Sequence, residues 1–184
     1  MKIAMIGAGY VGLVSGACFA DFGHDVVCVD TDEKKLVDLT KGRIPIYEPG
    51  LDRLVNDIVA AGRLTFTTEG AAAVKGAAGV FIAAGTPSRR GDGHADLTDV
   101  HAAARDLAKH LDEGTVIVTK STVPVGTGDE IERIIRAARP SANISVASNP
   151  EFLREGAAIE DFKRPNRIVI GVEDESAKNV LHDV

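Results

Sequence analysis

Two glutamates stand four residues apart in the stretch SNPEFLREG, which directly follows the apolar run ISVA. A carboxylate at the end of a strand can orient or deprotonate a water molecule if its pKa suits the working pH. Glu151 and Glu155 are therefore candidates for acid–base chemistry, and the alternative is that both face solvent. We expect a catalytic role for Glu151 and a positioning role for Glu155.

Hydroxyl side chains occupy similar places after two other apolar runs. Thr86 follows GVFIAAG, and Thr122 follows TVIVTKS. Ligands of open α/β sheets bind beyond the carboxyl ends of the strands, so both threonines and Glu151 would meet at one edge. The alternative is that these are three ordinary turns, since a proline closely follows each run and is a natural residue for ending a strand.

The first apolar run, KIAMIG, leads into GAGYVG, which places Gly7, Gly9 and Gly12 in the G-x-G-x-x-G pattern. A second run, DVVCVD, ends in Asp30, 18 residues after Gly12. This context is typical of a dinucleotide-binding βαβ unit. The glycines permit a tight turn, close approach of the pyrophosphate and close helix packing. Free backbone amides near Val11, at the start of the next helix, would face the phosphates.

Asp30 indicates which dinucleotide is expected. Its carboxylate would accept hydrogen bonds from the adenosine ribose hydroxyls and repel a 2′-phosphate, which favours NAD over NADP. Lys34 and Lys35 follow closely, and either a ribose or phosphate contact or a solvated helix face is consistent with them. The alternative for the glycines is that they serve only a turn.

The elements that must position these residues alternate along the chain. Short continuous apolar runs predict strands at 2–7, 25–30, 64–68, 79–85, 115–121, 144–148 and 167–172. Helices are predicted at 10–23, 32–42, 48–62 with Pro49 in the first turn, near 69–76, 98–111 and 127–138, and from near Asp174 to Val184. Continuously apolar strands between helices indicate a Rossmann-type, doubly wound α/β fold, with a mostly parallel sheet and helices on both faces. We expect one domain, residues 1–184, with one long loop at 86–97.

Composition limits the classes of function. The chain is 45% hydrophobic and 26% charged, as in ordinary globular proteins, and its net charge of −6 argues against nucleic acid or an acidic membrane as a partner. No apolar run reaches membrane-spanning length and no signal-peptide pattern is present, so we expect a cytoplasmic protein. Cys18 and Cys28 lie in apolar segments without a CxxC spacing and are expected in the core. We predict no metal site.

Five linked motifs, GAGYVG, IPIYEPGL, AAGTPS, KSTVPVGTG and SNPEFLREG, resemble the N-terminal half of the nucleotide-sugar 6-dehydrogenases. The resemblance covers essentially the whole chain, and REGAAIEDFKRPNRIVIG is more similar to members that act on UDP-glucose than to those that act on GDP-mannose. It implies NAD as cofactor and UDP-glucose or a related nucleotide sugar as substrate. Such enzymes oxidise the C6 alcohol to a carboxylate in two hydride transfers, through a cysteine-bound thiohemiacetal and thioester.

The same resemblance implies roles for individual residues. Thr122 and Glu151 would hold or activate the water that attacks the thioester, and Glu155 would lie between substrate and nicotinamide. Backbone groups of the segment from Glu151 to Glu155 would bind the UDP-sugar, which includes Phe152, Leu153 and Arg154. The NAD pocket would be lined by Val11, Asp30, Lys35, Thr86 and Thr122, in addition to the glycines.

Two parts of the family's chemistry do not occur in these residues: a cysteine in a GGxCxPKD-like segment and a lysine on a central helix. Because family members are more than twice as long, we expect an N-terminal part of a longer enzyme, inactive alone. The full-length enzyme is expected to be a homodimer, and the fragment's oligomeric state stays open. The remaining alternatives are a dehydrogenase for another nucleotide sugar and a stand-alone NAD-binding module.

Overall fold

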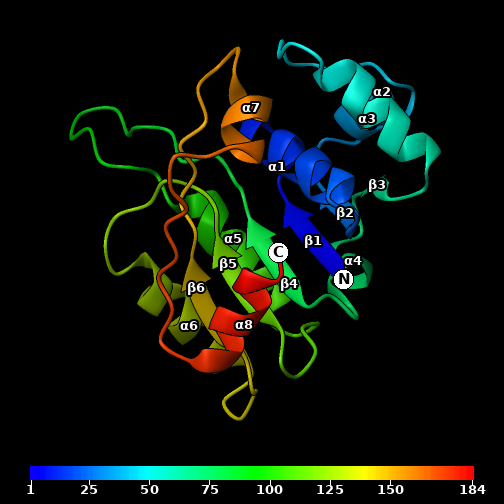
Figure 1. Ribbon diagram of the computed structural model, residues 1–184. Coiled ribbons are helices and arrows are strands. Elements are labelled where there is room, and N and C mark those ends of the chain that lie inside the picture. Colours follow the sequence, from blue (N-terminus) through cyan, green and yellow to red (C-terminus); the bar gives the residue numbers. More distant parts are fainter.

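Six apolar runs of the sequence form strands, and all six join in one parallel sheet (Figure 1). The structure, a computed structural model, describes residues 1–184. The order in the sheet is β3-β2-β1-β4-β5-β6, which confirms the doubly wound Rossmann-type arrangement. The strands are β1 (Lys2–Ile6), β2 (Asp25–Val29), β3 (Leu64–Thr67), β4 (Gly79–Ile82), β5 (Val116–Thr119) and β6 (Ser145–Ser148).

Helices cover both faces of the sheet. One face packs against a 25-residue apolar cluster shared with α1 (Tyr10–Asp21), α2 (Glu33–Thr40), α3 (Leu51–Ala60), α7 (Ala158–Lys163) and α8 (Glu175–His182). The other packs against a 17-residue cluster shared with α4 (Gly70–Val74), α5 (Thr98–Leu107) and α6 (Thr127–Ala138). Two separate apolar layers explain why the strands read as continuous apolar runs, because both of their faces are buried.

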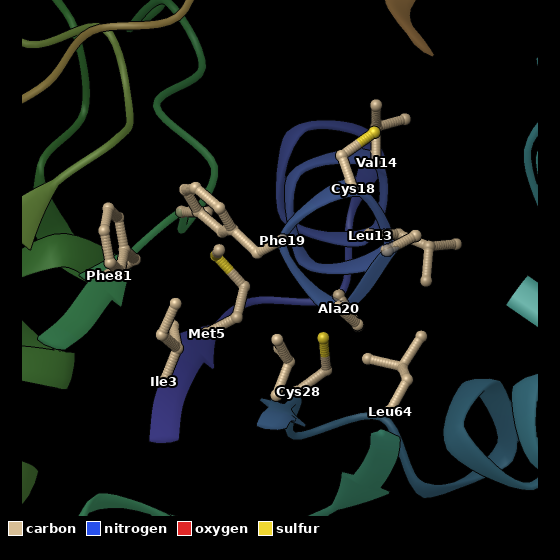
Figure 2. Close-up of a cluster of buried hydrophobic side chains, with 14 of the residues drawn as sticks. Ile3, Met5, Leu13, Val14, Cys18, Phe19, Ala20, Cys28, Leu64 and Phe81 are labelled. Atoms are coloured by element: carbon tan, nitrogen blue, oxygen red, sulfur yellow. The ribbon is translucent and has the colours of Figure 1, made fainter. Parts of the chain in front are cut away.

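The alternation along β1 shows how one strand serves both layers. Ile3 and Met5 belong to the α1 side, whereas Ala4 between them belongs to the opposite side. Figure 2 shows Met5 and Ile3 below Phe19 of α1, with Phe81 of β4 beside it, and the ring centroids of Phe19 and Phe81 lie 5.1 Å apart. These contacts fix α1 above β1 and β4, and thereby the place of the loop that precedes α1.

The strand order reverses between β1 and β4, and the register there places several loops at one edge of the sheet. Ile6, the last residue of β1, pairs with Val29 of β2 and with Ile82 of β4. Gly7 and Asp30 therefore follow directly after paired residues on neighbouring strands. This topological switch point is where ligands of open α/β sheets bind.

The register between β5 and β6 brings the candidate catalytic residues to the same edge of the sheet. Thr119 pairs with Ser148, the last residues of their strands. Thr122 and Glu151 each lie three residues beyond that pair, so both loops leave the same edge from adjacent strands.

The predicted strand at 167–172 is wrong. Only Gly171 pairs, through an isolated antiparallel bridge in which Gly171 and Ser148 exchange two backbone hydrogen bonds of 2.8 Å. Ile168 is 68% exposed and its neighbours are also exposed, so this apolar run has no continuing partner strand. An apolar run alone does not form a strand when no ladder accepts its backbone groups.

Several helix boundaries also differ from the predictions. Gly50, with a left-handed φ of 80°, caps α3, which therefore begins at Leu51, and Pro49 lies in the preceding turn. The helix predicted to run to Val184 ends at His182, where the Asp183 amide is shared between two carbonyls. The helix predicted to 111 ends at Leu107 and continues only as a turn.

Candidate active site

The dinucleotide loop joins β1 to α1, and each glycine in it has a distinct environment. Gly7 has a φ of 106°, and a Cβ there would lie 2.6 Å from the Ala83 carbonyl oxygen. A Cβ on Gly12 would lie 1.9 Å from the Gly7 carbonyl oxygen, so the turn closes only around glycine. Gly9, the N-cap of α1, has no atom within 4 Å of a Cβ position and so faces open space. This is a cradle that a phosphate can enter and a side chain would obstruct.

Asp30 is fixed at the end of β2 by three donors. The Ala8 amide and the Lys35 ammonium each donate to Oδ2 at 2.8 Å, and the Asp32 amide donates to Oδ1 at 3.0 Å. Burial alone would raise the pKa of Asp30, but the hydrogen bonds from Lys35 and the two amides outweigh it and hold the pKa below its usual value. Asp30 therefore presents an ionised acceptor beside the glycine loop. Lys35 pairs with it instead of facing only solvent, and Lys34 stays on the exposed side of α2.

The loops after β4 and β5 are fastened to each other. The Thr86 hydroxyl donates to the Thr122 carbonyl oxygen at 3.1 Å, and the Ser121 hydroxyl donates to the Ala84 carbonyl oxygen at 2.6 Å. Thr86 is half-buried, whereas the Thr122 side chain is exposed and its hydroxyl has no partner within the protein. The structure thus brings the two predicted threonines together and leaves the Thr122 hydroxyl free to bind a ligand or water.

The segment from Glu151 to Glu155 follows β6, and its side chains differ in exposure and in hydrogen bonding. Glu151 is half-buried, and its Oε2 accepts the Leu153 amide at 2.5 Å, which folds the carboxylate back over the loop. Phe152 is 60% exposed, and Glu155 is exposed. The Arg154 guanidinium is held by both carboxylate oxygens of Asp161, at 3.0 and 2.7 Å, and the Arg154 backbone amide also donates to Asp161 Oδ2, at 3.0 Å.

Lys120 and Asn149 are two residues of this region that the sequence analysis missed. Lys120 is 6% exposed, its ammonium donates to Asn149 Oδ1 at 2.9 Å, and it lies 5.4 Å from the centre of the Phe162 ring. Burial lowers the pKa of Lys120 to about 8, with the charge of Glu151 acting in the opposite direction. Lys120, Asn149 and Glu151 line an apolar cavity of about 140 Å³. A lysine within the apolar stretch TVIVTKS was the available signal.

Glu48 is the third missed residue, although it lies within the quoted motif IPIYEPGL. It is 6% exposed and accepts hydrogen bonds from the Tyr10 hydroxyl and from the Gly156 and Ala158 amides. The burial of the Tyr10 ring, and to a smaller extent the negative charge of Glu48 beside its hydroxyl, raise the pKa of Tyr10. A buried carboxylate thus lies between the glycine loop and the Glu151–Glu155 segment.

A family model described as the UDP-glucose/GDP-mannose dehydrogenase family, NAD binding domain, matches residues 1–184. The chain belongs to this family. The matched part of the family is its NAD-binding domain, and the structure places an open glycine turn at a helix N-terminus beside an ionised acceptor at the end of β2.

Named relatives agree with this assignment. Over the whole chain, a UDP-glucose 6-dehydrogenase of Rhizobium meliloti is 69% identical, and one of Bacillus subtilis, YwqF, is 50% identical. Among solved structures, GDP-mannose dehydrogenase from Pseudomonas aeruginosa has a TM-score of 0.94 at 34% identity over 100% of the chain. A UDP-glucose dehydrogenase from Pyrobaculum islandicum has a TM-score of 0.91 at 43% identity over 99% of it. The chain spans 42–43% of the length of these four proteins.

Neither cysteine of this family member is a nucleophile in the structure. Cys18 lies inside α1 and Cys28 inside β2, and both are buried as predicted. Burial raises the pKa of each thiol to about 12, so neither forms a thiolate near neutral pH. No group of three or more His, Cys, Asp or Glu side chains is placed to hold a metal ion, and no helix has the length and apolar character needed to cross a bilayer.

Proposed function

We propose that this chain is the cofactor-binding part of a dehydrogenase that oxidises UDP-glucose to UDP-glucuronate with NAD. The observation that carries the proposal is the meeting, at one sheet edge, of the dinucleotide loop with Thr122 and Glu151 in matching register. The 69% identity to a UDP-glucose 6-dehydrogenase supports this substrate. The proposal includes a cytoplasmic location and a homodimeric full-length enzyme, and the family resemblance supports the homodimer.

Different groups of the chain bind different parts of the cofactor. The free amides at the start of α1, around Gly9 and Val11, hold the pyrophosphate, and Asp30 accepts hydrogen bonds from the adenosine ribose. Lys35 keeps Asp30 in place, and Thr86 fixes the neighbouring loop against Thr122. Bound NAD supplies a hydride acceptor beside this edge.

The water chemistry falls to Glu151 and Thr122. In this proposal the Thr122 hydroxyl and the Glu151 carboxylate hold the water, and Glu151 takes its proton as the water attacks the thioester carbon. The thiol that leaves belongs to a cysteine outside this chain, since both thiols here are buried and protonated. Glu155, exposed at the end of the segment, positions substrate against the nicotinamide, and the backbone from Glu151 to Glu155 binds the sugar.

A GDP-mannose dehydrogenase is the second candidate, because a structure of that name has a TM-score of 0.94 to this chain. The backbone fold does not separate the two substrates, whereas sequence identity favours UDP-glucose, at 69% against 34%. Initial rates of the full-length protein with UDP-glucose and with GDP-mannose decide between them.

The catalytic part of the proposal is tested with Glu151→Gln in the full-length protein, with Glu160→Gln as a matched control. The amide side chain of the Glu151→Gln variant keeps the shape but cannot take a proton, so thioester breakdown slows and overall turnover falls by about 10²–10⁴-fold. A covalent sugar adduct should then accumulate on a cysteine peptide and be visible by mass spectrometry. Glu160 lies in the same region but pairs only with Arg164, so its variant should behave as wild type. Near wild-type turnover of Glu151→Gln without an adduct would refute the role of Glu151.

A further inference from the structure

Glu48 connects two segments that are far apart in the sequence. Its Oε2 accepts the Tyr10 hydroxyl at 2.6 Å and the Gly156 amide at 2.8 Å, and its Oε1 accepts the Ala158 amide at 2.8 Å. The two amides lie 108 and 110 residues away along the chain. The carboxylate thus touches the start of α1 on one side and the start of α7 on the other, and these helices pack together (Figure 1).

The carboxylate is held by neutral donors and forms no ion pair. Burying a charge costs desolvation free energy, and the hydrogen bonds to Glu48 must offset this cost. Burial by itself would raise the pKa of Glu48, but the hydrogen bonds from Tyr10 and the backbone amides outweigh it and lower the pKa. An ionised, acceptor-only carboxylate is what this arrangement of three donors requires.

The residues that Glu48 holds belong to both halves of the site. Tyr10 is the first residue of α1 and follows Gly9, whose open side is the phosphate cradle. Gly156 follows Glu155 directly and takes a left-handed φ of 86° as the segment turns into α7. Glu48 therefore links the glycine loop to the end of the Glu151–Glu155 segment by its shortest side-chain hydrogen bonds, beside a longer contact of 3.4 Å between the Tyr10 hydroxyl and the Arg154 carbonyl oxygen.

We propose that Glu48 is a positioning residue that holds the Glu151–Glu155 segment in register with the dinucleotide loop, so that NAD binding orders the segment that takes the sugar. The identity of that segment as the sugar-binding one rests on the proposed function. Glu48 itself touches neither the cradle nor the exposed face of the segment, and it acts through Tyr10 and the amides of Gly156 and Ala158.

Hydrogen exchange on the 184-residue chain tests the coupling without any catalysis. In wild type, saturating NAD should slow exchange of the Gly156 and Ala158 amides by about tenfold or more. In Glu48→Gln one acceptor oxygen becomes an NH₂ group that faces a donor, so these amides exchange about tenfold to a hundredfold faster. The NAD effect on them should also disappear although NAD still binds by calorimetry.

Two further variants separate coupling from general loss of stability. Glu113 joins two loops elsewhere, accepting the Asn143 amide and the Arg139 side chain, so Glu113→Gln should leave the NAD effect intact. Tyr10→Phe removes the hydroxyl that donates to Glu48, together with its 3.4 Å contact to the Arg154 carbonyl oxygen, keeps both amide bonds and should abolish the NAD effect while leaving basal exchange within about threefold. Tyr10→Phe also decides the matter if Glu48→Gln does not fold. An NAD effect that persists in Tyr10→Phe, or that is absent in wild type, would overturn the proposal.

Kinetics of the full-length protein test the consequence for the sugar. Glu48→Gln should raise KM for the nucleotide sugar about tenfold or more while KM for NAD changes less than threefold. A merely structural role predicts equal changes in both, which would contradict the proposal. If wild-type protein fails to oxidise any nucleotide sugar, the proposed function is wrong, and the exchange experiment alone decides the coupling.

Discussion

Two alanine substitutions in the glycine loop should separate folding from cofactor binding. In Gly12→Ala the new Cβ would lie 1.9 Å from the Gly7 carbonyl oxygen and 2.9 Å from its carbon, both backbone atoms that cannot rotate away. Overpacking of this kind costs about 3 kcal/mol or more, and the higher helix propensity of alanine returns only about 1 kcal/mol. We expect a net loss of about 2 kcal/mol or more, or a Tm lower by roughly 4–8 °C in a domain of this size.

Gly9→Ala should leave stability nearly unchanged and weaken NAD binding. Gly9 has a φ of −76°, which alanine adopts without strain, and no atom lies within 4 Å of the new Cβ. Stability should change by less than about 1 kcal/mol, as for other N-cap substitutions of glycine. The methyl group enters the space where the phosphates approach, so NAD affinity should fall at least about tenfold, or about 1.4 kcal/mol.

Urea unfolding and calorimetric titration with NAD, applied to both variants and wild type, provide the readouts. A Gly12→Ala protein as stable as wild type would refute the steric interpretation of the loop. Wild-type NAD affinity in Gly9→Ala would show that the pyrophosphate does not approach this turn.

Further predictions concern Lys120 and the two cysteines. Because the folded pKa of Lys120 is about 8 and its unfolded value is near 10.5, the unfolded chain binds more protons between these pH values, and stability should rise with pH across this window by up to about 3 kcal/mol. The two buried thiols lower stability over the same window in both proteins, so urea unfolding at pH 7.5 and 10 should show the Lys120 contribution as a rise in the stability of wild type relative to Lys120→Met; an equal change in both would contradict it. With both thiols buried, the 184-residue chain should produce no NADH from UDP-glucose and NAD, and steady NADH production would return Cys18 or Cys28 to consideration.

The parts of the fold that local sequence determines were predictable. The strand β4 and the interior of β1 are apolar because both faces are buried, and Gly7 and Gly12 occupy positions where a Cβ would clash with backbone atoms. The segment 167–172 carries the same apolar signal, but pairing depends on an available partner strand, which local sequence does not show. This is why a true strand and an unpaired apolar run looked alike.

Some residues of the site could also be predicted from the local sequence, and others could not. Asp30 and Thr122 could be placed because they follow their strands within one and three residues, so the sheet register brings both to the edge. Glu48 could not, because its partners lie 108 and 110 residues later and meet it only after α1 and α7 have packed. The low exposure of Lys120 likewise depends on Phe162 and Asn149, which arrive from other elements.

Calorimetric titration of the chain with NAD and with NADP tests the central claim most directly. The Asp30 carboxylate is ionised, and its side chain is 11% exposed. A 2′-phosphate about 4 Å away would be repelled by roughly 1 kcal/mol in water and about 4 kcal/mol near a protein surface. We therefore predict that NAD binds about tenfold or more tightly than NADP, and that Asp30→Ala weakens NAD and reduces this preference. Equal or tighter binding of NADP by wild type would contradict the assignment of Asp30 and of the cofactor site built around it.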